Sequence, residues 1–428
     1  MNGKRKFLFV SHIALVGDLA WQVKKEGHDV RYFIRDKAQK DVCDDVVEKV
    51  DDWEKHVDWA DVVVFDDVAF GETADKLRKQ GKAVIGGSAY TDKLEEDREF
   101  GQEEMKAVGM NVLAHWDFTD FDKAIDFLED NPGRYVLKPS GKAQNEKELL
   151  FVGQEDDGKD VHDVLIHYKK NWSKKIKTFQ LQKYAAGVEV AVGAFFNGID
   201  FIAPINVNFE HKRMFPGEIG PSTGEMGTSM FWVPQNAIFR ETLGRMKDRL
   251  AAAKYVGYID INCIVNAKGV YPLEFTSRFG YPTISIQLEG ITSKMGPFLY
   301  ELARHQQYEL KTKRGFQVGV VIACPPFPFD DPAAFRRYSE DATILFKRQV
   351  MDGVHIGDVK FVDDDWRLAG NSGYALIVTG SGITMEDARA QAYVRVKNIM
   401  IPNMFYRTDI GQRWRHEGDM LRTWGYLH

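Results

Sequence analysis

Two runs in the second half of the chain carry oxygen-bearing side chains at every second position. Asp260 and Asn262 alternate with apolar residues in the first run, and Glu274 and Thr276 alternate in the second. Side chains two residues apart on a strand share one face, and the polar turn at 266–269 favours a hairpin between the runs. That face would offer carboxylate, amide and hydroxyl oxygens, a set that suits Mg²⁺. A merely solvated face of an antiparallel pair is the alternative.

A short loop with a lysine at each end is a second candidate site. Residues 138–142 read Lys-Pro-Ser-Gly-Lys and follow a strand-like run. Backbone N–H groups and ammonium charge in such a loop can hold phosphate. The spacing is not that of a Walker loop and no helix follows directly, so a plain turn is the alternative.

The least regular stretch combines charge with glycine. Glu210-His-Lys-Arg213 precedes residues 217–227, which contain four glycines in eleven residues. Glycines at this density predict no regular element. Because glycine- and hydroxyl-rich loops of this length often bind ligands, we expect a binding loop, with a linker as the alternative.

The composition sets the class of protein to which these sites belong. The chain has 428 residues, of which 44% are hydrophobic and 28% charged, as in globular proteins of about three domains. The net charge of −6 argues against nucleic acid and anionic membranes as partners. Three scattered cysteines, Cys43, Cys263 and Cys324, give no disulfide framework and no metal motif, which favours a reducing, cytoplasmic setting.

The elements that position these residues fall into two patterns. Strands alternating with helices predict a mostly parallel sheet at the N-terminus, built on apolar runs 6–11, 29–34, 61–65 and 82–86. The basic start followed by an apolar run imitates a signal peptide, but no small-residue cleavage site follows. No apolar run reaches the roughly 18 residues of a membrane span.

The middle of the chain has an α+β pattern. One capped helix is expected over 91–108 and one long helix over 238–253. Asn197-Gly198 between two apolar runs predicts a hairpin. A further strand is expected at 316–323, after a lysine-rich segment at 311–314 that suggests a boundary.

Four ordered motifs resemble those of the glycinamide ribonucleotide synthetase (phosphoribosylamine-glycine ligase) family of the ATP-grasp superfamily. Residues 220–227 resemble the family's Gly-Pro-Asn-Thr-Gly-Gly-Met-Gly, and 210–213 its preceding Asp-His-Lys-Arg. Residues 273–283 are similar to Leu-Glu-Phe-Asn-x-Arg-Phe-Gly-Asp-Pro-Glu. Residues 94–98 resemble Leu-Glu-Gly-Ser-Lys, and 407–411 match a C-terminal Arg-x-Asp-Ile-Gly.

The resemblance implies an α/β and α+β fold in three parts. A Rossmann-like pre-ATP-grasp domain would occupy residues 1–92 and an ATP-grasp domain 93–312, with a small lid-like subdomain at about 112–186. A small β-rich C-terminal domain would follow at 313–428.

The resemblance also implies an ATP site with adenine against a hinge at 182–184 and the ribose near Glu189. The implied ATP-binding residues are Arg98, Lys138, Ser140, Gly141, Lys142, Gln182, Lys183, Tyr184 and Glu189. Glu274 would be the main Mg²⁺ ligand, with Mn²⁺ as an alternative metal, and Asn262 and Thr276 would complete the metal site. Thr276 stands where the family has Asn, and this change weakens a metal ligand.

The implied reaction is attack of a carboxylate on the γ-phosphate of ATP, followed by capture of the acyl phosphate by an amine. It needs positioning and charge neutralisation more than covalent catalysis. Arg278, Lys212 and Arg213 would be catalytic cations, and the substrates would lie against Gly220, Pro221, Ser222, Thr223, Gly224 and Gly227. The partners implied are a small carboxylate, glycine or another amino acid, and an amine acceptor. The sequence carries no signal for an oligomeric state.

Departures from the family pattern gather on the side of the amine substrate. The family's Gly-x-Gly-Gly-Arg-Glu-His appears as residues 11–17, where Ile13, Ala14 and Leu15 bring bulk to an expected phosphate cradle. Tyr281 and Thr283 replace an Asp and a Glu. We therefore expect a ligase with an altered amine acceptor. The alternatives are the authentic phosphoribosylamine-glycine ligase of purine biosynthesis and a non-catalytic ATP-binding module.

Overall fold

The N-terminal part of the chain folds as a five-stranded parallel sheet in the spatial order β3-β2-β1-β4-β5. The computed structural model describes residues 3–140 and 149–427. The strands are β1 (Lys6–Ser11), β2 (Asp29–Ile34), β3 (Glu48–Lys49), β4 (Val62–Phe65) and β5 (Val84–Ile85). This confirms the predicted parallel sheet.

Both faces of this sheet are buried, which explains its continuous apolar strands. Phe7 and Phe9 of β1 belong to one core cluster, while Leu8 and Val10 belong to another on the opposite face. The strand order reverses between β1 and β4, and the carboxyl ends of strands at such a reversal are where open α/β sheets bind ligands. The loop after β1 therefore lies at a favoured binding position.

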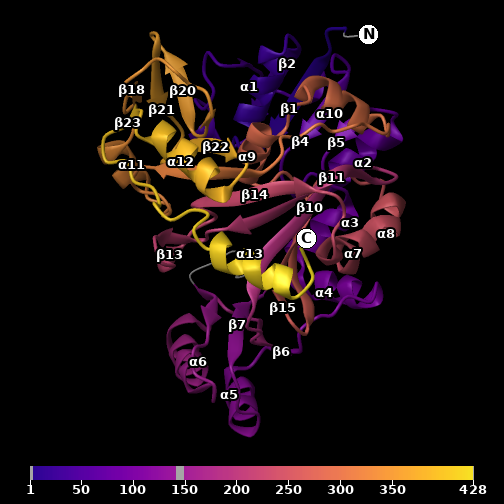
Figure 1. Ribbon diagram of the computed structural model, residues 1–428, viewed down its shortest axis with the longest axis vertical. Coiled ribbons are helices and arrows are strands. Elements are labelled where there is room, and N and C mark those ends of the chain that lie inside the picture. The colour runs from indigo at the N-terminus through magenta and orange to yellow at the C-terminus, as the bar shows by residue number, and fades with distance from the viewer. Residues whose placement is uncertain (1–2, 141–148, 428) are drawn as a thin grey trace.

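A second, antiparallel sheet of eight strands forms the centre of the molecule (Figure 1). Its strands in spatial order are β16 (Gly269–Thr276), β15 (Val256–Asn266), β10 (Val188–Asn197), β11 (Phe201–Glu210), β14 (Gly227–Val233), β17 (Phe316–Ala323), β22 (Tyr374–Gly382) and β19 (Val354–Ile356). The pairing of β14 with β17 carries the sheet from the middle of the chain into its C-terminal part. The strand expected at 316–323 and the hairpin expected at Asn197-Gly198 are both confirmed.

A four-stranded sheet in the order β6-β9-β7-β8 projects from the main body with two helices (Figure 1). Its elements are β6 (His115–Phe118), α5 (Phe121–Asp130), β7 (Tyr135–Pro139), β8 (Phe151–Val152), α6 (Lys159–Trp172) and β9 (Phe179–Lys183). Its side chains form a core cluster of their own. These elements, residues 115–183, lie within the range of about 112–186 that was expected for a lid-like subdomain, and we keep that name for residues 115–183.

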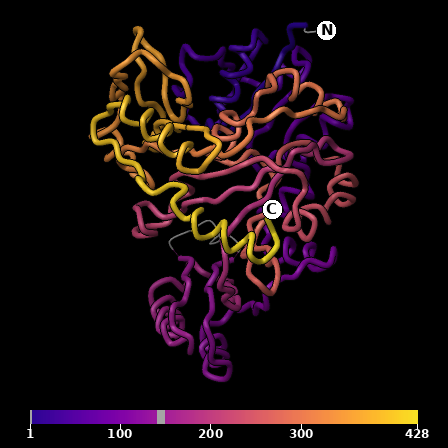
Figure 2. Tube along the Cα trace, in the orientation of Figure 1, coloured from indigo at the N-terminus to yellow at the C-terminus, as the bar shows by residue number. Residues whose placement is uncertain are grey.

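The C-terminal part of the chain returns to the central sheet. Helix α12 (Met385–Val396) packs on β22 and β17, and α13 (Trp414–Thr423) packs on β10 and β15. Figure 2 shows this last segment, in yellow, running from the C-terminal lobe back across the molecule. Trp414 anchors it, because its ring lies 5.1–5.3 Å from those of Phe209, Phe231 and Phe316.

Two helix predictions were wrong because polar residues interrupt the expected helices. The helix expected over 91–108 is two helices, α3 (Ala89–Glu96) and α4 (Arg98–Ala107). Asp97 separates them, and its carboxylate accepts the main-chain N–H of Phe100 as the N-cap of α4. The helix expected over 238–253 is broken at Thr242 into α7 (Ala237–Glu241), a short 3₁₀ turn and α8 (Lys247–Ala252).

The glycine-rich stretch is not free of regular structure, which corrects the prediction. Strands β12 (Arg213–Phe215) and β13 (Ile219–Ser222) form a small hairpin. Its turn requires left-handed backbone at two successive residues, Gly217 with φ +77° and Glu218 with φ +60°. Here the glycine makes a tight turn possible and does not abolish the strands.

Candidate active site

Strands β15 and β16 form the hairpin that the sequence predicted between the two polar runs. Asn262 lies opposite Glu274, and Asp260 lies opposite Thr276. The two pairs differ in burial, because the Glu274 side chain is 62% exposed while Asp260 is 3% exposed. The Glu274 end of this face is therefore open to a ligand.

Lys212 lies among three carboxylates from three strands. Its Nζ is 2.9 Å from Glu189 Oε1, 3.3 Å from Glu210 Oε2 and 3.8 Å from Glu274 Oε1. Asn262 Nδ2 donates to Glu189 Oε1 at 3.1 Å. Burial acts to lower the pKa of Lys212, but the three carboxylates outweigh it and raise the pKa well above its usual value. Glu189, predicted at the ribose, thus belongs to this carboxylate cluster.

The deeper end of the hairpin holds a carboxyl group that favours its neutral form. Burial, with the charges of Glu210 and Glu95, raises the pKa of Asp260 well above its usual value. A hydrogen bond from Thr276 opposes this shift. The Thr276 hydroxyl, predicted as a metal ligand, is therefore engaged with Asp260.

The oxygen donors fit a hard divalent cation that is completed by substrate. Within residues 3–140 and 149–427, no three His, Cys, Asp or Glu side chains converge as a preformed metal centre. Mg²⁺ usually takes only one or two carboxylates, together with substrate phosphates and water. Glu274, which is exposed, and Asn262 directly opposite it supply that kind of partial site.

Two cations approach the carboxylates from the lid-like subdomain and α4. Arg98 Nη1 donates to the carbonyl oxygen of Pro139 at 3.0 Å, which places the first residue of α4 beside the end of β7. Burial and the charge of Arg98 lower the pKa of Lys138 to about 8, against the opposing charge of Glu274. Both predicted phosphate ligands therefore lie near the metal-binding face.

The rest of the predicted phosphate loop is only partly described. Ser140 uses its main-chain N–H to bind the carbonyl oxygen of Thr178 at 2.9 Å. It can thus offer phosphate its hydroxyl and not its amide. Gly141 and Lys142 lie outside the described residues.

The predicted adenine hinge, residues 182–184, spans the end of β9. The main-chain N–H of Lys183 donates to Ala114 O at 2.8 Å, and that of Tyr184 donates to Arg134 O at 3.0 Å. These two residues can therefore offer adenine carbonyl groups and side chains only. The Gln182 side chain is 1% exposed and its Nε2 has no hydrogen-bond partner among the described residues.

Arg278 joins the hairpin to the N-terminal sheet through acids that sequence reasoning did not assign. Its Nε lies 3.0 Å from Glu95 Oε1 and 3.1 Å from Asp67 Oδ1. Burial acts to lower the pKa of Arg278, but Glu95, Asp67 and Asp260 outweigh it. Asp67 follows β4 at the carboxyl end of the sheet. Because ligands bind at that edge of open α/β sheets, this position could have identified Asp67 from the sequence.

The small hairpin of β12 and β13 packs beside Lys212. The main-chain N–H and the hydroxyl of Thr223 both donate to Lys212 O, at 2.8 and 2.9 Å. Arg213 Nη1 donates to Gly220 O at 3.0 Å, so this predicted catalytic cation is bonded within the hairpin. The structure does not place Arg213 in the carboxylate cluster.

The remaining predicted substrate residues have different surroundings. Pro221 and Ser222 belong to β13, and a side chain added at Gly224 would meet nothing within 4 Å. Gly227, at φ +144°, begins β14, and a Cβ there would lie 2.5 Å from Gly319 O. Gly227 is thus required for packing whatever its role toward substrate.

The loop after β1 closes over a buried carboxyl group. The hydroxyl of Ser11 donates to Asp66 and accepts the main-chain N–H of Leu15 at 3.2 Å. Burial raises the pKa of Asp66 to about 8. The His12 ring stacks on Phe70 with centroids 4.0 Å apart. Side chains therefore occupy the interior of this loop.

Two of the departures from the family motifs, Tyr281 and Glu225, lie in a group of aromatic and acidic side chains. Tyr281 stacks on Tyr374 with ring centroids 4.8 Å apart. Burial, then the charge of Asp358, raises the pKa of Tyr281, and Asp66 acts in the same direction. Glu225, which stands where the family motif has Gly, is 6% exposed. Burial, then Tyr281, raises the pKa of Tyr374, and Glu225 acts in the same direction. These side chains come from separate segments but share one electrostatic environment.

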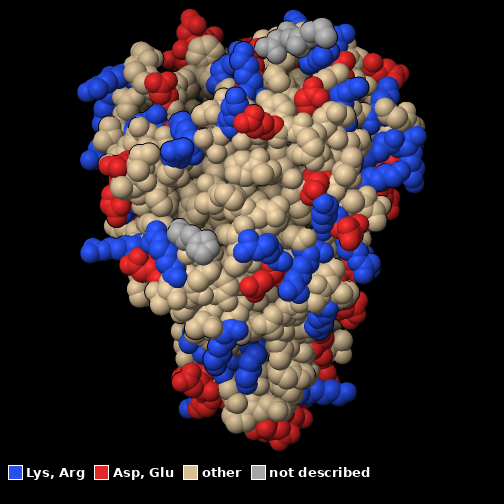
Figure 3. Space-filling view, turned by 45° about the vertical axis from the view of Figure 1, so that its right-hand side comes forward, with Lys and Arg blue, Asp and Glu red and all other residues tan. Residues whose placement is uncertain are grey.

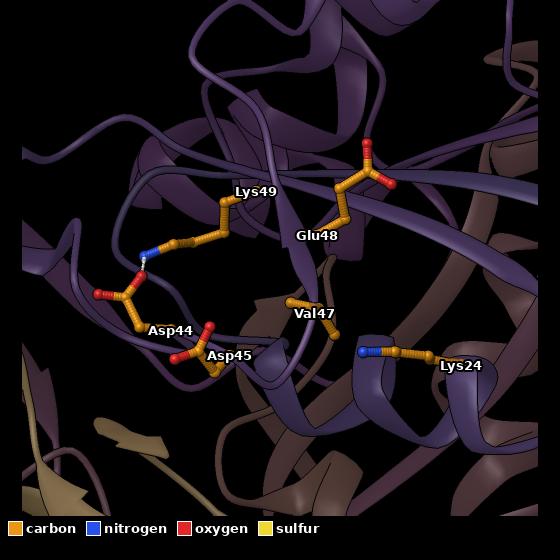
Figure 4. A pocket seen from close by; sticks show the side chains of 6 residues that line it. All are labelled: Lys24, Asp44, Asp45, Val47, Glu48 and Lys49. Carbon is orange, nitrogen blue, oxygen red and sulfur yellow. Dashed lines mark ion pairs between the residues drawn. The ribbon is translucent and has the colours of Figure 1, made fainter. Parts of the chain in front are cut away.

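Other surface features lie apart from this site. Figure 4 shows a pocket at the outer edge of the N-terminal sheet, where Lys49 pairs with Asp44 and Lys24 Nζ donates to Val46 O at 2.6 Å. On the face in Figure 3, acidic and basic side chains are interspersed around a largely uncharged middle area. None of the described helices combines the length and apolar character needed to cross a bilayer.

Comparison with known families gives two matches in chain order. The model of the phosphoribosylglycinamide synthetase ATP-grasp (A) domain matches residues 96–284, and that of the phosphoribosylglycinamide synthetase C domain matches residues 317–413. Together they cover more than half of the chain.

Individual relatives agree over most of the length. The phosphoribosylamine-glycine ligase of Streptococcus pneumoniae is 25% identical over 356 residues, covering 81% of this chain and 82% of the relative. That of Listeria monocytogenes is 25% identical over 374 residues, covering 85% and 86%. The crystal structure of the Thermotoga maritima phosphoribosylamine-glycine ligase superposes with a TM-score of 0.72 and 19% identity, covering 95% of this chain and 100% of that one, which shows a shared fold.

Proposed function

Because the chain belongs to the phosphoribosylglycinamide synthetase family of ATP-grasp ligases, which form C–N bonds with release of ADP, we propose that it is a carboxylate-amine ligase with an altered amine acceptor. The carboxylate would be glycine or another small amino acid. The observation that carries the altered acceptor is the loop of residues 11–17, which is filled by side chains where the family has glycines.

The described residues can meet the electrostatic needs of acyl phosphate formation. Arg98 and Lys138 would bind phosphate oxygens, and Lys212 would stabilise negative charge as it develops beside Glu274. Arg278, held by Glu95 and Asp67, would contact the acyl phosphate and orient it toward the amine.

Glu274 and Asn262 would hold Mg²⁺, or Mn²⁺ in its place. When bound, the metal would neutralise negative charge on the phosphate groups. The amine must then arrive uncharged, and a nearby carboxylate can accept its proton. Asp67 follows β4 at the carboxyl end of the N-terminal sheet, 3.1 Å from Arg278 Nε, and is the carboxylate that we assign to this role.

Three features of the acceptor side argue against a phosphorylated amine. The Ile13 side chain is 45% exposed at the tip of the loop. Asp66 lies buried directly beneath the loop, bonded to Ser11. Glu225 stands where the family has Gly, and Tyr281 stands where it has Asp. Glu225 would repel a phosphate dianion, and Asp66 fills the space beneath the loop in a largely neutral form, so an amine without phosphate fits better.

A second candidate, the authentic phosphoribosylamine-glycine ligase, is favoured by the backbone of the same loop. Ala14 keeps a left-handed conformation, with φ +59°, although it is not glycine. Among residues 13–16 as described, only Leu15 donates its main-chain N–H to a partner. Helix α1 (Gly17–Lys25) begins without a side-chain cap. Open amides at a helix N-terminus can bind phosphate.

Acyl phosphate formation is testable without knowing the acceptor. Purified protein with ATP and Mg²⁺ would be incubated with hydroxylamine and one amino acid at a time, and ADP and aminoacyl hydroxamate would be quantified. We expect hydroxamate with glycine or another small amino acid. ATP binding without hydroxamate or ADP across the panel would favour a non-catalytic module.

The acceptor itself requires a second assay. Freshly generated phosphoribosylamine would be compared with amines that lack phosphate, and products would be identified by mass spectrometry. We expect little product with phosphoribosylamine, and we expect Ile13→Gly combined with Glu225→Gly to increase it. Turnover of phosphoribosylamine and glycine by the unmodified protein at the rate of the Streptococcus pneumoniae ligase would establish the second candidate instead.

A further inference from the structure

A segment of the C-terminal domain, residues 407–413, lies against the stretch that carries Lys212. Arg407 is completely buried, and its guanidinium makes a two-pronged contact with Asp409, Nε to Oδ1 at 2.8 Å and Nη2 to Oδ2 at 2.7 Å. Nη2 also donates to Glu218 Oε1 at 2.8 Å, and Nη1 donates to Arg213 O at 2.8 Å. A planar fork bound on several sides has one orientation only.

Two further contacts extend this attachment on both sides of Lys212. Asp409 Oδ2 accepts the main-chain N–H of Gly217 at 3.0 Å. Arg413 Nη2 donates to Glu210 O at 2.6 Å. Residues 407–413 thus hold the main chain at positions 210, 213 and 217, and the side chain of Glu218, on both sides of Lys212.

Asp409 is charged and His211 is neutral near pH 7. Burial opposes ionisation of Asp409, but Arg407 and the N–H of Gly217 outweigh it and hold the pKa at about 2. His211 lies beside these groups, 1% exposed, and burial followed by the charges of Arg413 and Arg407 lowers its pKa to about 3. His211 is therefore neutral and adds no repulsion.

The placement of the main chain at Lys212 decides which carboxylates its ammonium can reach. Its three partners, Glu189, Glu210 and Glu274, come from β10, β11 and β16. Lys212 O is fixed by Thr223, which directly follows β13 of the hairpin that Arg407 holds. A shift of about 1 Å in such a group can reduce turnover about 100-fold.

We propose that Arg407 is a positioning residue for Lys212, so that the C-terminal domain completes the active site of the ATP-grasp domain. The proposal rests on the proposed function, in which the cluster around Lys212 stabilises phosphoryl transfer. It predicts that loss of the guanidinium lowers turnover more than it weakens ATP binding, because among the described residues Arg407 contacts the hairpin and neither Arg98 nor Lys138.

The test compares Arg407→Gln with a matched variant, Arg395→Gln. Arg395 is also a cation bound to a buried carboxylate, with Nη1 3.1 Å from Glu289 Oε2, but none of its contacts reaches residues 210–223. We expect Arg407→Gln to lower kcat for hydroxamate formation about 100-fold while KM for ATP changes less than about 3-fold. Arg407→Lys should recover part of the lost kcat. Arg395→Gln should keep the kcat of the unmodified protein although its Tm is similar to that of Arg407→Gln.

Hydrogen exchange of the amides of residues 211–223 gives a readout that does not depend on turnover. We expect faster exchange there in Arg407→Gln and not in Arg395→Gln. Should Arg407→Gln fail to fold, Glu218→Gln removes only a partner whose side chain is 40% exposed and should give the same effects at smaller size.

The outcomes separate the two proposals. Equal kcat and equal exchange in Arg407→Gln and Arg395→Gln would overturn the positioning role. An unmodified protein that binds ATP but forms no hydroxamate would contradict the proposed function alone, and exchange at 211–223 would still decide whether Arg407 orders the hairpin.

Discussion

At the scale of single residues, Lys138 links pH to nucleotide binding. Burial and Arg98 bring its pKa to about 8, so its ammonium is lost as pH rises through that value. We expect ATP affinity to weaken between pH 7 and 9.5, because a charged phosphate ligand becomes neutral. Calorimetric titration with a non-hydrolysable ATP analogue measures this.

The matched variant for this effect is Lys138→Arg. A guanidinium stays protonated throughout this pH range. The variant should therefore bind with an affinity that depends less on pH, even if its affinity at pH 7 is lower. Parallel pH profiles for the two proteins would show that another group is responsible.

Glu274 is the second residue whose role is open to a direct measurement. Its side chain is the exposed carboxylate of the cluster, opposite Asn262. We expect Glu274→Gln to lower hydroxamate formation at least about 100-fold and to raise the Mg²⁺ concentration needed for half-maximal rate, because a neutral amide holds a hard cation poorly. Glu309→Gln, at another exposed glutamate, serves as the control and should leave both quantities unchanged.

At the scale of elements, the start of β14 depends on one glycine. Gly227 has φ +144°, and a Cβ there would approach Gly319 O to 2.5 Å, at the pairing of β14 with β17. We expect Gly227→Ala to lower the free energy of unfolding by about 1–3 kcal/mol through backbone strain, with a further loss from the close contact. Urea unfolding followed by circular dichroism measures the loss.

Gly224 provides the comparison within the same motif. An added Cβ there meets nothing within 4 Å. Gly224→Ala should therefore change the free energy of unfolding by less than about 0.5 kcal/mol. Equal losses in the two variants would mean that the close approach to Gly319 does not govern this junction.

At the scale of the whole molecule, the central sheet makes the ATP-grasp and C-terminal regions interdependent. β17 pairs with β14 on one side and with β22 on the other. A fragment of residues 1–312 would expose the edge of β14 and the apolar residues that β17 covers. Because unpaired strand edges promote aggregation, we expect this fragment and its complement, residues 313–428, to be insoluble when expressed separately.

Removal of the lid-like subdomain is the contrasting experiment. Its core is separate, and the chain enters and leaves it at neighbouring points, because Lys183 N donates to Ala114 O at 2.8 Å. Replacing residues 115–183 by a short glycine linker should leave a soluble protein that no longer binds ATP. Sedimentation and nucleotide titration test both expectations. Soluble fragments 1–312 and 313–428 would contradict the first, and ATP binding by the protein without residues 115–183 would contradict the second.

The local spacing of apolar and polar residues determined several strands and one polar face of this protein. Continuous apolar runs predicted β1, β4 and β17, because strands buried on both faces need no alternation. Alternation predicted that Asn262 and Glu274 share one face, because the repeat of two residues is a property of the strand itself. Four motifs placed the chain in its family.

Only the tertiary structure determined which distant groups meet. Glu95 contacts Arg278 across 183 positions of sequence, and Arg407 contacts the main chain of Arg213 across 194. The helix break at Asp97 likewise depends on capping geometry that a helical pattern does not encode. Sequence spacing fixes contacts between neighbours in the chain, whereas contacts between distant segments follow from how whole elements pack, and those contacts complete the site.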